Sequence, residues 1–151
     1  MTDWGGHMFG AALHGIGLDH TGPTEVWMDN GNLTYLFANG MKIRVIGGAP
    51  KYICEKGEVQ PVSEFKIPPG LRWYEDGAQS PQQDLINCVV NRKRPFQDVE
   101  YAHRTATVCH LGNICYKLNR KLRWDPEKED FIGDSEASRL IDRPRRGPWQ
   151  I

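Results

Sequence analysis

The stretch NLTYLFANGMKIRVI, residues 32–46, carries the strongest structural signal in this chain. Apolar side chains recur with a period of two on both sides of Asn39-Gly40, which is typical of paired strands. Because Asn and Gly both tolerate positive φ, the dipeptide favours a β-hairpin closed by a two-residue type I′ turn. The strands are expected over 32–38 and 41–46, with Ala38 paired to Met41.

This register divides the side chains of the hairpin between two faces. The face assigned to the core carries Thr34, Leu36, Ala38, Met41, Ile43 and Val45. The other face carries Leu33, Tyr35, Phe37, Lys42, Arg44 and Ile46. On it Tyr35 is expected opposite Arg44, and Phe37 opposite Lys42. Rings and cations in this arrangement fit either a partly exposed face or an oligomer surface.

The residues before the hairpin predict a helix and then a strand. The helix is expected over about 2–18 and is apolar on one side, at Trp4, Met8, Ala11 and Ala12. Five glycines interrupt it, and each interior glycine costs a helix about 0.5–1 kcal/mol relative to alanine. We therefore expect its backbone to approach a neighbour closely. His20-Thr21-Gly22-Pro23 ends the helix, and a strand is expected over 24–28.

Regular structure is weak after the hairpin and resumes at Ser80. Short extended pieces are expected over 52–54 and 58–65, followed by a loop through Pro68-Pro69-Gly70. Ser80-Pro81-Gln82-Gln83 has the pattern of a capping box with proline at the first helical position. It predicts a helix over 81–90 that buries Leu85, Ile86 and Val89.

A second long helix is expected over 99–118. Its apolar stripe comprises Val108, Leu111, Cys115 and Leu118. Asn119 is expected to end it in the left-handed conformation. A strand over 121–124 and a short helix over 135–141 follow. Strands and helices do not alternate regularly, so the order of elements favours the α+β class rather than a doubly wound sheet.

Chain length, net charge and the distribution of apolar residues narrow the classes of function that fit this sequence. The chain has 151 residues, which is a usual length for one domain, and 19 basic residues balance 19 acidic ones. Zero net charge disfavours polyanion binding, so NRKRP (91–95) and RPRR (143–146) are interpreted as solvated turns rather than a nucleic-acid site. There is no signal peptide or membrane-spanning apolar run, and the sequence as written predicts a cytoplasmic protein.

Two classes of motif are missing from the sequence. The four cysteines show no C-x-x-C spacing, and we expect small buried side chains rather than a disulfide or zinc framework. No G-x-G-x-x-G and no Walker-type loop is present. The chain therefore lacks a nucleotide-binding fingerprint of its own.

Asp3 and His7 form the candidate catalytic pair. Residues at i and i+4 share one face of a helix, so Asp3 is placed to orient the His7 ring as a general base. The spacing alone equally fits an Asp3 side chain that only caps the helix. His14 lies on the same stripe, but three ligands along one helix cannot surround a metal ion without others from elsewhere.

Several stretches resemble the C-terminal part of Gfo/Idh/MocA oxidoreductases, the glucose-fructose oxidoreductase and inositol dehydrogenase family. They include TDWGGHMF (2–9), GIGLDHTGP (15–23), FANGMKIRVIGG (37–48) and INCVVNRKRP (86–95). The most specific is HRTATVCHLGNICYKLNRKLRWDPEKEDFIGDSEASRLIDRPRRGPWQI (103–151), which resembles a bacterial subgroup ending in W-D-P-x-x-E...R-x-P-W. The resemblance implies an open, largely antiparallel sheet with helices packed on one face.

The resemblance also assigns roles. A D-x-x-x-H motif in the family faces the nicotinamide of NAD or NADP, which makes His7 the proton-transfer residue on a sugar or cyclitol hydroxyl and Asp3 its partner. It also shifts our interpretation of the Tyr35, Phe37, Lys42 and Arg44 face towards a homo-oligomer surface. Where the subgroup continues H-H-F-D, this chain has Met8 and Gly10, and His14 stands where tryptophan is usual.

Residues 1–151 therefore correspond to the family's substrate-binding and oligomerisation domain without its N-terminal Rossmann domain. We expect the chain alone to bind no NAD(P) and to be inactive by itself. Two hypotheses follow. The chain is either the C-terminal part of an NAD(P)-dependent oxidoreductase, as a truncated or fragment chain, or a non-catalytic sugar-binding or dimerisation module derived from that family.

Overall fold

The computed structural model describes residues 2–47, 51–59, 78–142 and 146–148. Contacts divide the chain into two compact units. The first comprises residues 1–47 and 104–151, and the second comprises 48–103. Each unit is described by itself.

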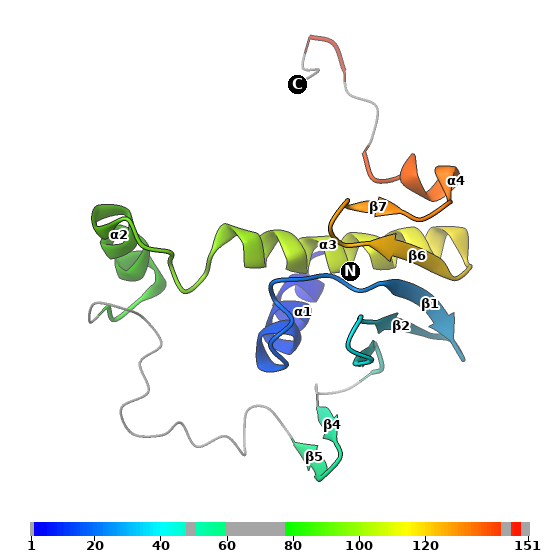
Figure 1. Ribbon diagram of the computed structural model, residues 1–151, viewed down its shortest axis with the longest axis horizontal. Coiled ribbons are helices and arrows are strands. Elements are labelled where there is room, and N and C mark those ends of the chain that lie inside the picture. The colour runs from blue at the N-terminus through cyan, green and yellow to red at the C-terminus, as the bar shows by residue number, and fades with distance from the viewer. Residues whose placement is uncertain (1, 48–50, 60–77, 143–145, 149–151) are drawn as a thin grey trace. The chain divides into compact units, whose positions relative to one another are not determined.

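A five-stranded sheet forms the framework of the first unit (Figure 1). Its strand order is β3-β2-β1-β6-β7, and every neighbouring pair is antiparallel. The strands are β1 (Glu25–Asp29), β2 (Asn32–Leu36), β3 (Lys42–Arg44), β6 (Leu122–Asp125) and β7 (Asp130–Phe131). The two edge strands, β3 and β7, are the short ones, as is common at the edges of open sheets. The predicted strands over 24–28, 32–38, 41–46 and 121–124 are confirmed in type, whereas β7 was not predicted.

The register of the hairpin differs from the prediction by one residue. Leu36 pairs with Lys42 and Tyr35 with Ile43. The Phe37 amide donates to the Met41 carbonyl at 2.9 Å, so three residues close the turn rather than two. The last of them, Gly40, has φ +86°, which matches a three-residue loop that ends in a left-handed glycine. Asn-Gly thus marks the hairpin correctly but not the length of its loop.

The predicted core face is wrong for the first strand of the hairpin, whereas Ile43 and Val45 of the second strand pack against the core as predicted. Leu33, Tyr35 and Phe37 are buried, at 0%, 0% and 2% exposure, and the partly buried Ile43 and Val45 pack against the same cluster. A slip of one residue on one strand exchanges the side chains that share a face with its partner. Tyr35 and Phe37 therefore do not form a surface with Lys42 and Arg44, which are exposed and belong to the opposite face of the sheet.

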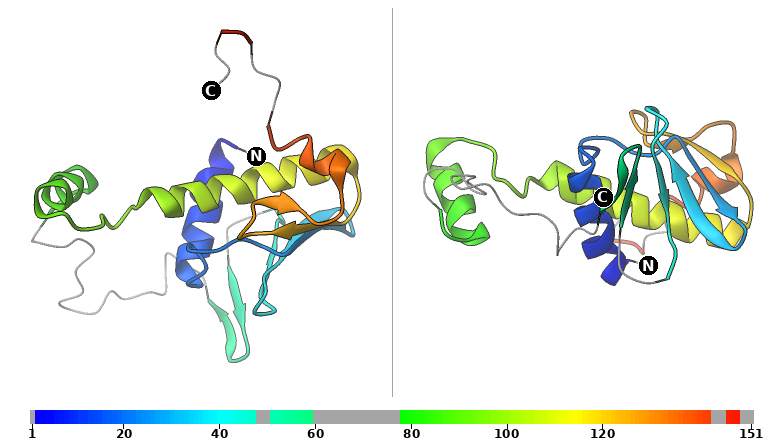
Figure 2. Two further views of the ribbon diagram at one scale, coloured as in Figure 1. Left: turned by 45° about the horizontal axis from the view of Figure 1, so that its top comes forward. Right: turned by 90° about the horizontal axis from the view of Figure 1, so that it is seen from below.

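Two helices cover the core face (Figure 2). Helix α1 (Trp4–Gly15) buries Phe9 and Leu13, and the Phe9 ring meets the Tyr35 ring edge to face with centroids 5.4 Å apart. Helix α3 (Val99–Leu118) buries the predicted Val108, Leu111 and Cys115. Leu118 is partly buried. Asn119 ends the helix at φ +48°, as predicted.

Two glycines of α1, Gly5 and Gly10, face α3. A Cβ on Gly5 would lie 3.4 Å from Cys109 Sγ, and one on Gly10 would lie 3.6 Å from Thr105 Cγ2. These are ordinary van der Waals distances, so a methyl group would fit against α3 at both positions. The expected close backbone approach, which would require glycine, is therefore not found at these two positions. At Gly6 an added Cβ would meet nothing within 4 Å.

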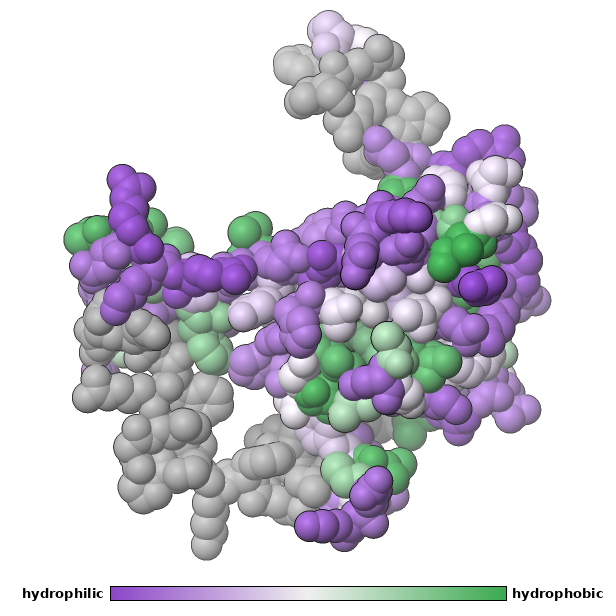
Figure 3. All heavy atoms as spheres, viewed as in Figure 1, coloured by the Kyte–Doolittle hydropathy of each residue, from purple (hydrophilic) through white to green (hydrophobic). Residues whose placement is uncertain are grey.

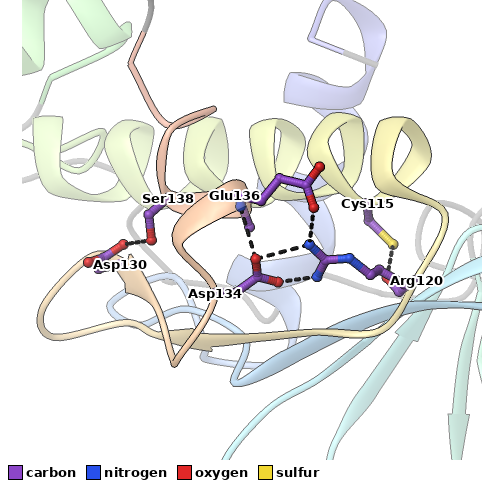
Figure 4. A network of polar contacts seen from close by, with 7 residues as sticks. Cys115, Arg120, Asp130, Asp134, Glu136 and Ser138 are labelled. Carbon is purple, nitrogen blue, oxygen red and sulfur yellow. Dashed lines mark hydrogen bonds and ion pairs between the residues drawn. The ribbon is translucent and has the colours of Figure 1, made fainter.

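Arg104 and Arg120 form ion pairs and hydrogen bonds that link elements in the C-terminal part of the first unit. Arg104 Nη1 donates to the Pro126 carbonyl at 2.8 Å and lies 3.0 Å from Glu129 Oε1, which ties α3 to the β6–β7 turn. Arg120 contacts both oxygens of Asp134 and lies 2.8 Å from Glu136 Oε2 (Figure 4). Asp134 also caps α4 (Ser135–Ser138), which is shorter than the helix predicted over 135–141.

The second unit contains a small hairpin and helix α2. Strands β4 (Tyr52–Cys54) and β5 (Gly57–Val59) pair antiparallel, so the extended piece at 52–54 is confirmed. Most of the piece predicted over 58–65 and the Pro68-Pro69-Gly70 loop lie outside the described residues.

Helix α2 (Pro81–Asn91) begins at the predicted cap, where the Gln83 amide donates to Ser80 Oγ at 3.2 Å. Its predicted buried side is wrong. Leu85, Ile86 and Val89 are 52–62% exposed, whereas Asp84 and Cys88 are 2% exposed. Figure 3 shows hydrophobic residues at the surface over α2. Asp84 is buried because Oδ2 accepts the Phe96 amide at 2.8 Å, which satisfies a backbone donor of the following loop.

The predicted α+β class, with an open antiparallel sheet and helices on its core face, is confirmed. Within the described ranges no helix is long and apolar enough to cross a membrane.

Candidate active site

The two predicted catalytic residues lie at the start of helix α1, with His7 in its first turns. Asp3 is the residue before the helix, and its carbonyl oxygen accepts the Gly6 amide at 3.0 Å. Its carboxylate makes no capping hydrogen bond to the helix, so the capping interpretation is not supported. Asp3 and His7 are both exposed, and no hydrogen bond or ion pair joins these two described side chains.

The His7 ring instead contacts the Trp4 ring. Their centroids lie 5.9 Å apart, and the ring planes are tilted by 56°. Trp4 is 76% exposed and Met8 43% exposed, so the predicted apolar side of α1 points largely to solvent around His7. Phe9 and Leu13 anchor the helix from its other side. The fold therefore holds α1 in place and presents Trp4, His7 and Met8 outward.

The structure forms a different carboxylate–imidazole pair at the far end of α1. His14 Nδ1 lies 2.7 Å from Asp19 Oδ2, and His20 Nδ1 lies 3.8 Å from Asp19 Oδ1. The helix ends with Gly17 at φ +67°, and the Leu18 amide donates to the Leu13 carbonyl at 2.9 Å. This is the hydrogen-bond pattern of a Schellman motif, and it turns Asp19 back towards His14.

This second pair was not predicted from the sequence. Gly17 after the last helical turn, with Leu13 and Leu18 five residues apart, was the signal that indicated the motif. The side chain of Asp19 is 16% exposed and that of His14 is 52% exposed. The pair therefore lies at the surface, with the carboxylate largely sheltered.

Metal binding at α1 finds no support. Within the ranges that the structure describes, no group of three or more His, Cys, Asp or Glu side chains is arranged to hold a metal ion. His14 pairs with Asp19 rather than converging with Asp3 and His7. Cys88, Cys109 and Cys115 are buried free thiols, as expected, whereas Cys54 is exposed. Burial raises the pKa of Cys109 and of Cys115, which disfavours their reactive thiolate forms.

The described residues do not fit a dinucleotide. Nucleotide phosphates bind where a glycine-rich turn leads from a strand into a helix whose amides are free to donate. In the described part of the chain, α4 is the helix that follows a strand of the main sheet, and the Asp134 carboxylate accepts its Ala137 amide. A carboxylate at this position repels phosphate. That the chain alone binds no NAD(P) stays a prediction.

The fold and the exposed histidine define a class of protein, an α+β domain that presents one helix beside an open antiparallel sheet. Residues 27–151 match a family model described as the C-terminal alpha/beta domain of an oxidoreductase family, the Gfo/Idh/MocA group. The match covers most of the chain, and the chain belongs to this family. Comparisons with curated proteins and with solved structures find no match. Asp3 and His7 precede the matched residues, so their catalytic roles stay predictions.

Proposed function

We propose that this chain is the C-terminal, substrate-binding part of an NAD(P)-dependent oxidoreductase that acts on CH–OH groups of sugars or cyclitols. The observation that carries the proposal is the family membership of residues 27–151 together with an exposed histidine on an anchored helix. Oxidation of an alcohol removes a proton from oxygen and a hydride from carbon. His7 is the proton acceptor in this proposal, and the hydride acceptor is a nicotinamide held by a Rossmann domain outside these residues.

The packing of α1 supports the role of His7. A general base must be held where it reaches the substrate hydroxyl, and small displacements are costly in rate. Phe9 and Leu13 are 5% and 0% exposed, which fixes the helix on the sheet while His7 stays open to solvent. Asp3 lies one turn earlier and is also exposed. We propose that its carboxylate turns towards His7 once substrate is bound.

Homo-oligomerisation is proposed through the side of the sheet opposite the core, and not through Tyr35 and Phe37. That side carries Lys42 and Arg44, and on β1 it carries the partly exposed Trp27. Lys121 Nζ lies 5.0 Å from the Trp27 ring centroid and 2.6 Å from Glu25 Oε2. This charged, aromatic surface fits a polar interface between copies of the domain.

A cytoplasmic location is also proposed.

The reading frame that surrounds the gene provides the first test. An in-frame segment before the Met1 codon that encodes G-x-G-x-x-G after a strand pattern supports the proposal. A stop codon followed by an unrelated gene contradicts it.

Enzyme kinetics provide the second test, on the complete product of that reading frame. Reduction of NAD⁺ and NADP⁺ is followed with a panel of aldoses, inositols and their methyl glycosides. His7→Ala should lower kcat by about 10²–10⁴-fold, the usual contribution of a positioned general base. Asp3→Asn should lower it less. His110→Ala is the matched control, because His110 is an exposed histidine on α3 to which no catalytic role is assigned, and it should retain activity. Unchanged turnover in His7→Ala would overturn the assigned role.

The alternative is a non-catalytic sugar-binding or dimerisation module. The observation that favours it is the missing hydrogen bond between Asp3 and His7, together with Met8 and Gly10 in place of the polar residues of the subgroup. Sugar binding or a stable dimer without any NAD(P)-dependent turnover of the complete product would favour this module. Turnover that depends on His7 would exclude it.

A further inference from the structure

Trp4 exposes most of its side chain beside the proposed catalytic histidine. At 76% exposure it contributes little to the core, and α1 is already anchored through Phe9 and Leu13. A single exposed apolar residue is ordinary on a protein surface. Trp4, however, is followed one turn later by the exposed Met8, and its ring contacts the imidazole of His7. Trp4 and Met8 are therefore two exposed apolar side chains one helical turn apart, and the Trp4 ring borders the candidate general base.

We propose that Trp4 is the platform on which the ring of a neutral sugar or cyclitol stacks, and that this stacking brings a ring hydroxyl to His7. The proposal rests on the proposed function and adds a residue that determines substrate binding. One face of a pyranose or inositol ring presents C–H bonds, whereas its hydroxyls project from the perimeter. The face of an indole is apolar and carries partial negative charge, so it attracts such C–H groups.

The geometry of the Trp4–His7 contact suits this arrangement. The imidazole lies 5.9 Å from the centre of the indole and is tilted by 56°, so it borders the platform rather than covering it. A ring centred over the indole would then direct a perimeter hydroxyl towards the imidazole, which is the contact that proton transfer needs. Met8 extends the platform with a flexible apolar side chain.

The charged side chains on α1 bear on the choice of substrate. Helix α1 contains no Lys or Arg, and the first basic residue of either type in the sequence is Lys42. Asp3 adds an exposed carboxylate at the same end of the helix. The hydroxyls of a neutral ring can donate to the Asp3 carboxylate, whereas α1 offers no Lys or Arg side chain to pair with a sugar phosphate.

The test is an NMR titration of the ¹⁵N-labelled 151-residue chain. The probes are scyllo-inositol and methyl β-D-glucopyranoside as cyclic ligands, sorbitol as an acyclic control, and nicotinamide mononucleotide as a competing aromatic occupant. The cyclic probes should shift the Trp4 indole N–H and the amides of Gly5 to Met8 in a saturable way. Sorbitol should not, because it has no ring face.

Variants isolate the indole. Trp4→Ala should weaken the binding of the cyclic probes by about tenfold, and Trp4→Phe by less, because stacking on a phenyl ring is partly retained. Tyr116→Ala is the control, since Tyr116 is an exposed aromatic on α3 and should leave binding unchanged. Far-UV circular dichroism should show the same helix content in all three variants.

Four results would overturn the proposal. They are the absence of shifts with both cyclic probes, equal shifts with sorbitol, equal affinity in Trp4→Ala, and binding of nicotinamide mononucleotide but not of the cyclic probes to Trp4. Failure of the proposed function is distinguishable from these results. Cyclic probes that bind at Trp4 without any turnover of the complete product would overturn the oxidoreductase and keep the platform. Turnover that needs His7, with an unchanged KM in Trp4→Ala, would support the oxidoreductase and overturn the platform.

Discussion

The hydroxyl of Tyr35 donates a hydrogen bond to the carbonyl oxygen of Val108 at 2.9 Å. Tyr35 is fully buried on β2, and Val108 lies in the middle of α3, so the bond joins the sheet to the helix that covers it. Burial raises the pKa of Tyr35, and the hydroxyl therefore stays protonated as a donor. This contact fixes which face of β2 belongs to the core.

Tyr35→Phe removes the donor and keeps the ring. The loss should lower the free energy of unfolding by about 0.5–1.5 kcal/mol, the net value of a neutral hydrogen bond. Urea denaturation followed by circular dichroism measures it. Tyr116→Phe is the control, because Tyr116 is 48% exposed, and its midpoint should not change. Equal midpoints for both variants would show that the Tyr35 hydroxyl contributes nothing.

Gly40→Ala tests the three-residue turn of the hairpin. Gly40 has φ +86°, a conformation that costs an L-residue about 1–2 kcal/mol, and the variant should be destabilised by that amount. Gly47→Ala provides the comparison, because a Cβ at Gly47 would meet nothing within 4 Å and its φ is not positive. Equal thermal midpoints for the two variants would contradict the observed turn.

Asp134→Asn tests the ion pair with Arg120. The hydrogen bond from Arg120, followed by that from the Ala137 amide, lowers the pKa of Asp134 from 3.8 to about 2. Since the folded state lowers this pKa, the carboxylate stabilises the fold above its ordinary pKa, and this contribution is lost as the pH falls towards 2. Asn can still cap α4, so the variant isolates the charge.

The Asp134→Asn variant should therefore be less stable than the wild type at pH 7, by a difference that shrinks progressively as the pH is lowered to about 2. Thermal unfolding across this range measures the difference. Glu127→Gln, at an exposed carboxylate of the β6–β7 turn, should show a much smaller one. A difference that stays constant with pH would rule out the charge as its cause.

Asp84→Ala and Leu85→Ala test the orientation of α2. Asp84 is buried and accepts the Phe96 amide, so Asp84→Ala removes this hydrogen bond and should cost about 1–3 kcal/mol. Leu85 is 52% exposed, and its replacement should cost below about 0.5 kcal/mol. Hydrogen exchange at the Phe96 amide should accelerate in Asp84→Ala alone. A larger loss of stability in Leu85→Ala than in Asp84→Ala would indicate that the apolar side of α2 is its buried side.

Local chemistry explains the predictions that were confirmed. Ser80 and Pro81 begin α2, and Asn119 ends α3, because caps depend only on residues within one turn of the helix end. Asn39-Gly40 marks the hairpin for the same reason. The stripe of α3 was also readable, since Val108, Leu111 and Cys115 recur at helical spacing and all three are buried.

The sequence did not indicate which of the two faces of β2 belongs to the core. β2 offers Leu33, Tyr35 and Phe37 on one side and Thr34 and Leu36 on the other, and either set fits the alternation of a strand. The loop length shifted the register by one residue, and a shift of one residue exchanges the faces. The buried side of α2 was predicted wrongly for a related reason. Asp84 is buried on that helix because it accepts a backbone amide that lies twelve residues away in the sequence.

For the candidate site, the sequence determined which residues are available and the tertiary structure decided how they meet. The spacing of Asp3, Trp4 and His7 placed them on the first turns of one helix, because helical periodicity is a local property. Only packing showed that Phe9 and Leu13 face the sheet, so that Trp4 and His7 are presented together to solvent. Only the backbone turn at Gly17 brought Asp19 to His14. Contacts of this kind depend on long-range packing and on backbone direction, and periodicity does not encode them.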